Sequence, residues 1–153
     1  MVSGNFVLEK LIPNIRVHTI IQNMIIASSG YSILISNDYE LDLIINKTGV
    51  SKGDLLTKAR IIIVTLGDMG SRILTPDKEM AIPAAKARVV EDPTGAGDSY
   101  RGGLISGLVR SLPIAQAARM GSVCASFAVE CYGTQDYKFT PEEFEDRFKK
   151  CYG

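Results

Sequence analysis

Residues 92–98 read Asp-Pro-Thr-Gly-Ala-Gly-Asp, and this stretch decides how the rest of the chain is interpreted. Val89 and Val90, just before it, are typical of the end of a buried strand, and residues 102–109 are predicted to be helical. The stretch therefore lies at a predicted strand-to-helix junction. Main-chain N–H groups at a helix start have no intrahelical acceptors and form the positive end of the helix dipole.

The middle of the stretch is suited to binding an anion. Gly95, Ala96 and Gly97 have almost no side chain, so an anion can approach their N–H groups closely. Asp98 follows directly, and a carboxylate beside an anion site suggests a base held next to a phosphate. The structural alternative is an ordinary glycine-rich turn, with Asp98 as a favourable first-turn carboxylate.

Alternating strand and helix patterns extend on both sides of this junction. Residues 61–65, Ile-Ile-Ile-Val-Thr, are typical of a parallel strand covered on both faces. Residues 140–143, Thr-Pro-Glu-Glu, combine a helix cap, a first-turn proline and a capping-box glutamate. We predict strands at 31–36, 60–66, 71–75, 79–83 and 87–90. We predict helices at 22–28, 37–47, 95–110 and 114–131, with two more starting at 51 and 140. This alternation predicts an α/β fold, a three-layer α/β/α sandwich.

Length and composition fit one globular domain. The chain has 153 residues, of which 46% are hydrophobic and 22% charged, and its formal net charge is zero. A neutral chain without a basic block argues against nucleic acid or an anionic membrane as the main partner. The apolar run at 20–27 is too short to span a bilayer. Three cysteines without metal-like spacing fit a reducing, cytoplasmic location.

Residues 92–98 resemble the second signature of the ribokinase-like (PfkB) carbohydrate and nucleoside kinases, whose core reads Asp-Thr-x-Gly-Ala-Gly-Asp. Pro93 and Thr94 are the variant positions, and they tilt the resemblance towards the adenosine-kinase-like branch. Residues 37–40 resemble the family's Asn-x-x-Glu motif, and residues 65–70 its Thr-x-Gly-x-x-Gly turn. The three motifs occur in the family's order, within a similarity that extends over about residues 32–148. The resemblance implies a ribokinase-like sandwich.

The resemblance also implies a role for each motif residue. Asp98 would be the catalytic base, and the main chain of Gly95, Ala96 and Gly97 would form the anion hole for the transferred phosphoryl group. The residues expected to bind ATP are Asn37, Thr65, Gly67 and Gly70. The residues expected to hold metal ions are Glu40 for Mg²⁺, and Asp92 and Thr94, near Gly133, for a monovalent cation such as K⁺.

Local sequence offers a structural alternative for most of these residues. Asn37 and Glu40 can be a helix cap and a helix-start carboxylate, and Asp92 can be a buried loop carboxylate satisfied by backbone amides. Gly67 and Gly70 fit a tight turn. The small residues at 121–125 can leave room for adenine or allow close helix packing. Arg101 can steady Asp98 three residues before it, although a solvated helix charge is the default.

Family members are longer than this chain, and their early Gly-Gly signature, lid and most of the substrate pocket have no counterpart here. We therefore expect a truncated domain, with residues 31–153 as the carboxy-terminal half and residues 1–30 unassigned. The implied function is ATP-dependent phosphoryl transfer to an alcohol of a sugar or nucleoside. The alternative is a catalytically silent remnant, because a base and an anion hole without a substrate wall cannot orient the alcohol. Such a remnant would bind nucleotide, or would associate through uncovered sheet surface or with a missing half.

Overall fold

The computed structural model describes residues 24–28 and 31–153. Its strands form one five-stranded sheet in the order β1-β2-β3-β4-β5. The strands are β1 (Met24–Ser28), β2 (Tyr31–Asn37), β3 (Ile61–Thr65), β4 (Ser71–Leu74) and β5 (Glu79–Ile82). β1 and β2 are antiparallel, with Met24 opposite Ile35. β2 and β3 are parallel, with Asn37 opposite Thr65 at their carboxyl ends. The sheet is therefore mixed, with the predicted parallel pair inside it.

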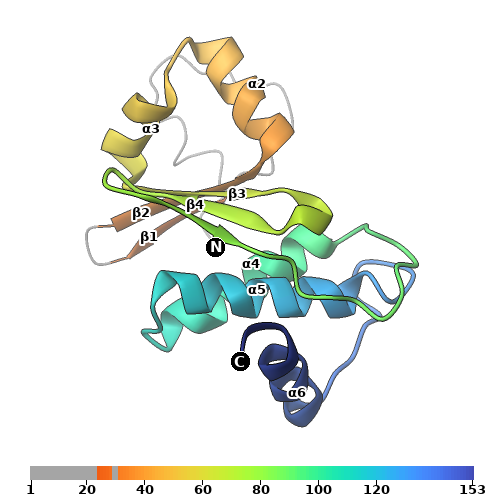
Figure 1. The fold of residues 1–153 in the computed structure, drawn as a ribbon. Coiled ribbons are helices and arrows are strands. Elements are labelled where there is room, and N and C mark those ends of the chain that lie inside the picture. Colours follow the sequence, from red (N-terminus) through yellow and green to blue (C-terminus); the bar gives the residue numbers. More distant parts are fainter. Residues whose placement is uncertain (1–23, 29–30) are drawn as a thin grey trace. The chain divides into compact units, whose positions relative to one another are not determined.

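The chain divides into two compact units, and the first comprises residues 1–66 and 72–81. In its described part, α2 (Asp38–Thr48) and α3 (Lys52–Ala59) lie over one face of the sheet (Figure 1). A reciprocal capping box starts each helix, where the sequence predicted a helix cap at Asn37 and a helix start at Ser51, and Gly49 ends α2 in the left-handed conformation. The buried residues between the helices and the strands are Leu34, Leu41, Ile44, Leu55, Ala59, Ile62 and Val64.

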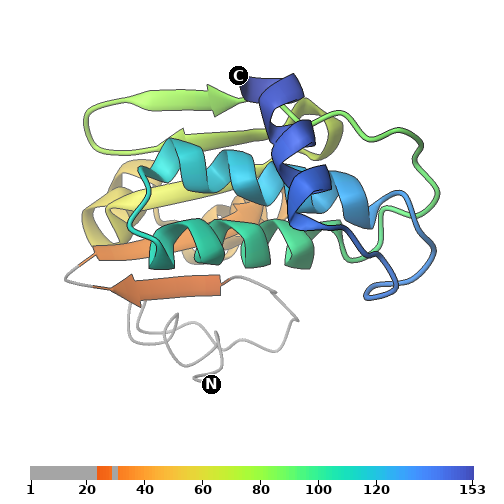
Figure 2. The same cartoon turned by 90° about the horizontal axis from the view of Figure 1, so that it is seen from below.

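The second unit comprises residues 67–71 and 82–153. It contains the short 3₁₀ helix η1 (Gly67–Met69), α4 (Ala96–Val109), α5 (Ile114–Ala128) and α6 (Pro141–Tyr152). Figure 2 shows α4 and α5 running side by side. Their contact is made by small residues, because a Cβ at Gly121 would lie 2.6 Å from Tyr100 O. The small residues of α5 therefore serve helix packing, which is the alternative that the sequence offered to an adenine pocket.

Two adjacent glycines of α4 test this packing. A Cβ at Gly103 would lie 2.7 Å from Met120 O, so Gly103→Ala forces the helices apart and should destabilise the protein by ~1–3 kcal/mol. Gly102 faces open space, so Gly102→Ala should stabilise it by ~0.5–1 kcal/mol through helix propensity. Urea unfolding of both variants measures the difference. Equal effects would show that α4 and α5 do not approach this closely.

Helix α6 packs on α5 through a row of aromatic rings. Phe127 of α5 stacks on Phe139 at 4.6 Å between ring centroids, and Phe139 in turn contacts Phe144 at 5.8 Å. Phe148 and Tyr152 continue the row along α6. The predicted Thr140 capping box starts α6, with Thr140 Oγ1 accepting the Glu143 N–H. The aromatic cluster anchors the carboxy-terminal helix by apolar burial.

Three sequence predictions of secondary structure are wrong. Residues 24–28 form strand β1 rather than a helix, because a short apolar run does not distinguish the two and pairing with β2 decides. Residues 87–90 form no strand, and Val89 and Val90 are 47% and 67% exposed. The N–H groups of Glu91 and Asp92 instead bond to Val129 O, so this segment is tied to the end of a helix. Helix α5 ends at Ala128, three residues earlier than predicted.

Most of segment 1–30, to which the sequence assigned no motif, lies outside the described residues. Within 24–28 and 31–153, every helix is too short or too polar to cross a lipid bilayer.

Candidate functional site

The start of α4 has the geometry of an open anion site. Gly95 is the N-cap, with φ of 83°, and no side chain caps α4 or α5, whereas reciprocal boxes close the starts of α2, α3 and α6. A Cβ at Gly97 would meet nothing within 4 Å, so its backbone faces open space. The Ala96 N–H already donates to Pro93 O at 3.2 Å. Of the three predicted amides, Ala96 is therefore committed to a turn.

Asp98 lies in the same turn and faces solvent. Its side chain is 71% exposed, and its Oδ1 accepts from the Arg101 guanidinium at 2.7 Å. The Arg101 side chain is only 15% exposed, so the default prediction of a solvated arginine is wrong and the alternative is correct. The guanidinium fixes the orientation of the carboxylate through Oδ1.

Asp92 is held by the loop around it. Its Oδ1 accepts the Thr94 N–H at 2.8 Å, and its Oδ2 accepts the Gly133 N–H at 3.2 Å. Hydrogen bonds from the Thr94 side chain, the Thr94 N–H and the Gly133 N–H hold the pKa of Asp92 below its usual value. Both oxygens are engaged with the chain itself, as expected of a loop carboxylate satisfied by amides.

Gly95 and Gly97 should respond to substitution in opposite ways. Gly95 has positive φ, and its Cβ would lie 3.0 Å from Thr134 Cα, so Gly95→Ala should destabilise the protein by ~1–3 kcal/mol. Gly97→Ala meets no atom and should be neutral to stabilising by ~1 kcal/mol, and its methyl group should weaken nucleotide binding if the predicted anion site lies there. Thermal melts and nucleotide titration of both variants check this. Unchanged nucleotide binding in Gly97→Ala would place the anion elsewhere.

In the first unit, the structure brings Asn37, Glu40 and Thr65 together at the carboxyl ends of β2 and β3. Asn37 Oδ1 accepts the Glu40 N–H at 2.7 Å, and Glu40 Oε2 accepts the Asn37 N–H at 3.1 Å. Thr65 Oγ1 donates to Ser36 O at 3.4 Å, which fastens the two strand ends. Asn37 and Glu40 therefore form the helix cap that the sequence offered as an alternative. The carboxyl edge of parallel strands is where α/β sheets usually bind ligands.

The two turn glycines in the second unit differ from one another. Gly67 and Gly70 both have positive φ, and the Gly70 N–H donates to Gly67 O at 3.1 Å. A Cβ at Gly70 would lie 2.1 Å from Ile82 O, so the chain's own backbone requires a glycine there. Gly67 faces open space. Of these two turn glycines, only Gly67 has a backbone that a ligand could approach.

The turn after α5 lies beside the signature stretch, where the resemblance placed Gly133 near Asp92 and Thr94. Residues 129–134 contact the signature stretch through Val129 O, Gly133 N and the backbone of Thr134. The hydrogen bond from Gly133 to Asp92 joins residues 41 positions apart, so the contact itself has no local signal in the sequence. Ser99, just after Asp98, donates to Tyr137 OH at 2.9 Å, which adds a further tie to this region. No group of three or more His, Cys, Asp or Glu side chains in residues 24–28 and 31–153 is placed to hold a metal ion.

Comparison with known proteins gives a consistent family. The pfkB family of carbohydrate kinases matches residues 9–141. The nucleoside kinase of Methanocaldococcus jannaschii is 38% identical over 119 residues, which are 78% of this chain and 39% of that protein. The inositol 3-kinase of Arabidopsis thaliana is 41% identical over 95 residues, which are 59% of this chain and 27% of that protein. The chain thus spans about two fifths or less of these relatives.

Solved structures give the same result. The crystal structure of the Methanocaldococcus jannaschii nucleoside kinase, a member of the ribokinase family, superposes with a TM-score of 0.73 at 38% identity, over 77% of this chain and 40% of that one. The nucleoside kinase of Burkholderia thailandensis in complex with inosine has a TM-score of 0.76 at 36% identity, over 79% and 40%. These matches confirm the predicted ribokinase-like α/β fold. The chain belongs to the pfkB family of carbohydrate kinases.

Proposed function

We propose that this chain acts in ATP-dependent phosphoryl transfer to an alcohol of a sugar or nucleoside. The observation that carries the proposal is the start of α4, where an uncapped helix end faces open space at Gly97 and an exposed carboxylate, Asp98, lies in the same turn. Phosphoryl transfer needs donors around the moving group and a base beside the alcohol. The kinase relatives support the reaction class.

In this proposal the main chain at the start of α4 stabilises the charge on the transferred phosphoryl group. The donors are Gly95 and Gly97, because the Ala96 N–H is bonded to Pro93 O. Asp98 accepts the proton of the attacking hydroxyl, and Arg101 holds its carboxylate in place. The Burkholderia relative is solved with inosine, which supports a nucleoside or sugar as the acceptor.

The proposed nucleotide is ATP with Mg²⁺, which when bound neutralises phosphate charge. Glu40 fits as a ligand through water, because its helix-capping contact uses only Oε2. Asn37, Thr65 and Gly67 remain predicted nucleotide contacts, whereas Gly70 has a structural reason of its own. A monovalent cation at Asp92 and Thr94 stays a prediction from the resemblance, because both Asp92 oxygens already accept amide hydrogens.

Calorimetry followed by a product assay tests the proposal. We expect the chain to bind Mg-ATP. When it is then supplied with a panel of sugars and nucleosides, we expect phosphorylated product. Removal of Mg²⁺ with EDTA should weaken nucleotide binding, because the phosphates lose their counter-charge. Binding without product would assign the chain to the alternative, a silent nucleotide-binding module. Absence of binding would contradict both.

A further inference from the structure

Residues 83–95, which we call the strap, lead from β5 to α4 and run beside α5 (Figure 1). The strap is hydrogen-bonded to α5 and to the residues that directly follow it. The Ala85 N–H donates to Ser122 Oγ at 2.8 Å, and the Glu91 N–H donates to Val129 O at 2.8 Å. Near the middle, the Arg88 N–H donates to Glu130 Oε1. These bonds hold the strap in place just ahead of the Gly95–Asp98 turn.

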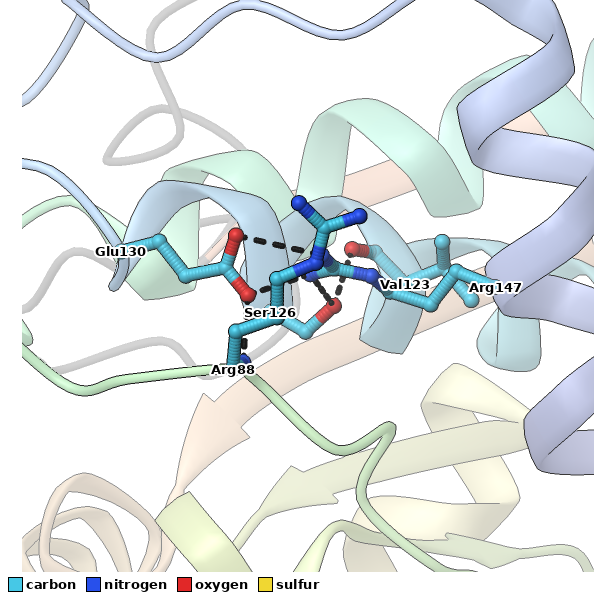
Figure 3. Close-up of polar contacts among 5 residues, drawn as sticks. All are labelled: Arg88, Val123, Ser126, Glu130 and Arg147. Atoms are coloured by element: carbon cyan, nitrogen blue, oxygen red, sulfur yellow. Dashed lines mark hydrogen bonds and ion pairs between the residues drawn. The ribbon is translucent and has the colours of Figure 1, made fainter.

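Glu130 is itself held by a buried arginine of α6 (Figure 3). Arg147 Nη1 lies 2.9 Å from Glu130 Oε1, and Arg147 Nη2 lies 3.1 Å from Oε2. Arg147 Nη1 also donates to Ser126 Oγ at 3.0 Å, and the guanidinium stacks 3.6 Å from the centroid of Phe127. The Arg147 and Glu130 side chains are 8% and 14% exposed. Glu130 Oε1 thus accepts the Arg88 N–H and also pairs with the Arg147 guanidinium.

Apolar burial does not hold the strap at this point. Val89 and Val90, next to Arg88, are mostly exposed, so hydrogen bonds carry the attachment there. A buried ion pair is weak evidence for stability, since apolar residues of similar size often do as well. A fixed hydrogen-bond acceptor, by contrast, defines one register for the segment that it binds.

We propose that Glu130, held in place by Arg147, is a positioning residue that fixes the register of the strap and thereby the placement of the Gly95–Asp98 turn. The part that concerns phosphate binding rests on the proposed function, whereas the register itself does not. Glu130 acts through the Arg88 amide and contacts no substrate.

The native chain offers a direct test of the register. Amide hydrogen exchange should protect Arg88 at least about tenfold over its exposed neighbours Val89 and Val90, since only Arg88 has a fixed acceptor. Exchange of Arg88 as fast as Val89 and Val90 would overturn the proposal without any substitution.

A pair of double variants separates positioning from packing. Glu130→Gln with Arg147→Met removes both charges but keeps an oxygen for the Arg88 N–H, whereas Glu130→Met with Arg147→Met removes that oxygen as well. We call these two double variants Gln/Met and Met/Met. We expect trypsin to cleave after Lys86 or Arg88 about tenfold faster in Met/Met than in Gln/Met, although the two proteins should have similar melting temperatures. Equal cleavage rates would overturn the proposal. Glu79→Gln, in the exposed pair with Arg72, is the matched surface control and should cleave like the native chain.

Mg-ATP titration of the same proteins links the register to the site. We expect binding to weaken about tenfold in Met/Met and to recover in Gln/Met, which a purely structural role would not produce. If the native chain binds no Mg-ATP, the proposed function fails while exchange and cleavage still decide the register. If Met/Met is cleaved faster yet binds Mg-ATP normally, the link to the phosphate site is wrong.

Discussion

Replacement of Asp98 by asparagine is expected to lower phosphoryl transfer by ~10²–10⁴-fold, the usual contribution of a positioned general base. Asparagine keeps the size of the side chain and an oxygen for Arg101, but it cannot take the proton of the attacking hydroxyl. Affinity for Mg-ATP should stay within a few fold of the native value, because the anion is bound by main-chain amides. Product formation and calorimetry on the same preparations measure the two effects separately.

Asp54→Asn provides the matched control. Asp54 is the third residue of α3, as Asp98 is of α4, and both side chains are exposed. Asp54 forms a capping box with Ser51, away from the start of α4 in sequence, so its substitution should leave transfer unchanged. Retained transfer in Asp98→Asn would remove Asp98 from the mechanism. Equal loss in both variants would point to a general effect of charge.

The largest effect on stability is expected from Arg147→Met alone. It leaves Glu130 buried and without its partner, and loss of one member of a buried ion pair typically destabilises by ~3–5 kcal/mol. The guanidinium also leaves the face of Phe127 and the Ser126 hydroxyl. Urea unfolding should show a large drop in the midpoint with little change in its slope.

Substitution of the partner as well should recover most of that loss. In Glu130→Met with Arg147→Met neither charge is left unpaired, so the double variant should be more stable than Arg147→Met. If Arg147→Met alone were as stable as the native chain, Glu130 and Arg147 would not be paired in solution. Glu79→Gln, at the exposed pair with Arg72, should change stability by less than ~1 kcal/mol.

Local signals predicted the helix starts and the family correctly. The capping boxes at Asn37, Ser51 and Thr140 are formed by side chains three residues apart, so the sequence alone carries them. The β-branched run of β3 likewise needs only its own residues to be recognised. The signature stretch 92–98 identified the family because seven positions act together.

Features that depend on distant partners were not predicted. β1 is a strand because β2 pairs with it, and Val89 and Val90 are exposed because their segment is tied to Val129. The buried Arg147 pairs with a glutamate 17 residues away, and nothing in the charge pattern of α6 marks it as buried. At the candidate site, the sequence offered the Arg101 contact as an alternative and the resemblance placed Gly133 near Asp92, whereas the hydrogen bonds that make these contacts required the structure.

The most direct test of the account is a titration of the isotope-labelled chain with Mg-ATP, followed by the amide resonances. We expect the largest shifts to fall on Gly95, Gly97 and Asp98 at the start of α4, and we expect Gly97→Ala to reduce them. Shifts confined to other regions, or equally large shifts at the capped start of α6, would contradict the assignment of the phosphate site to this turn.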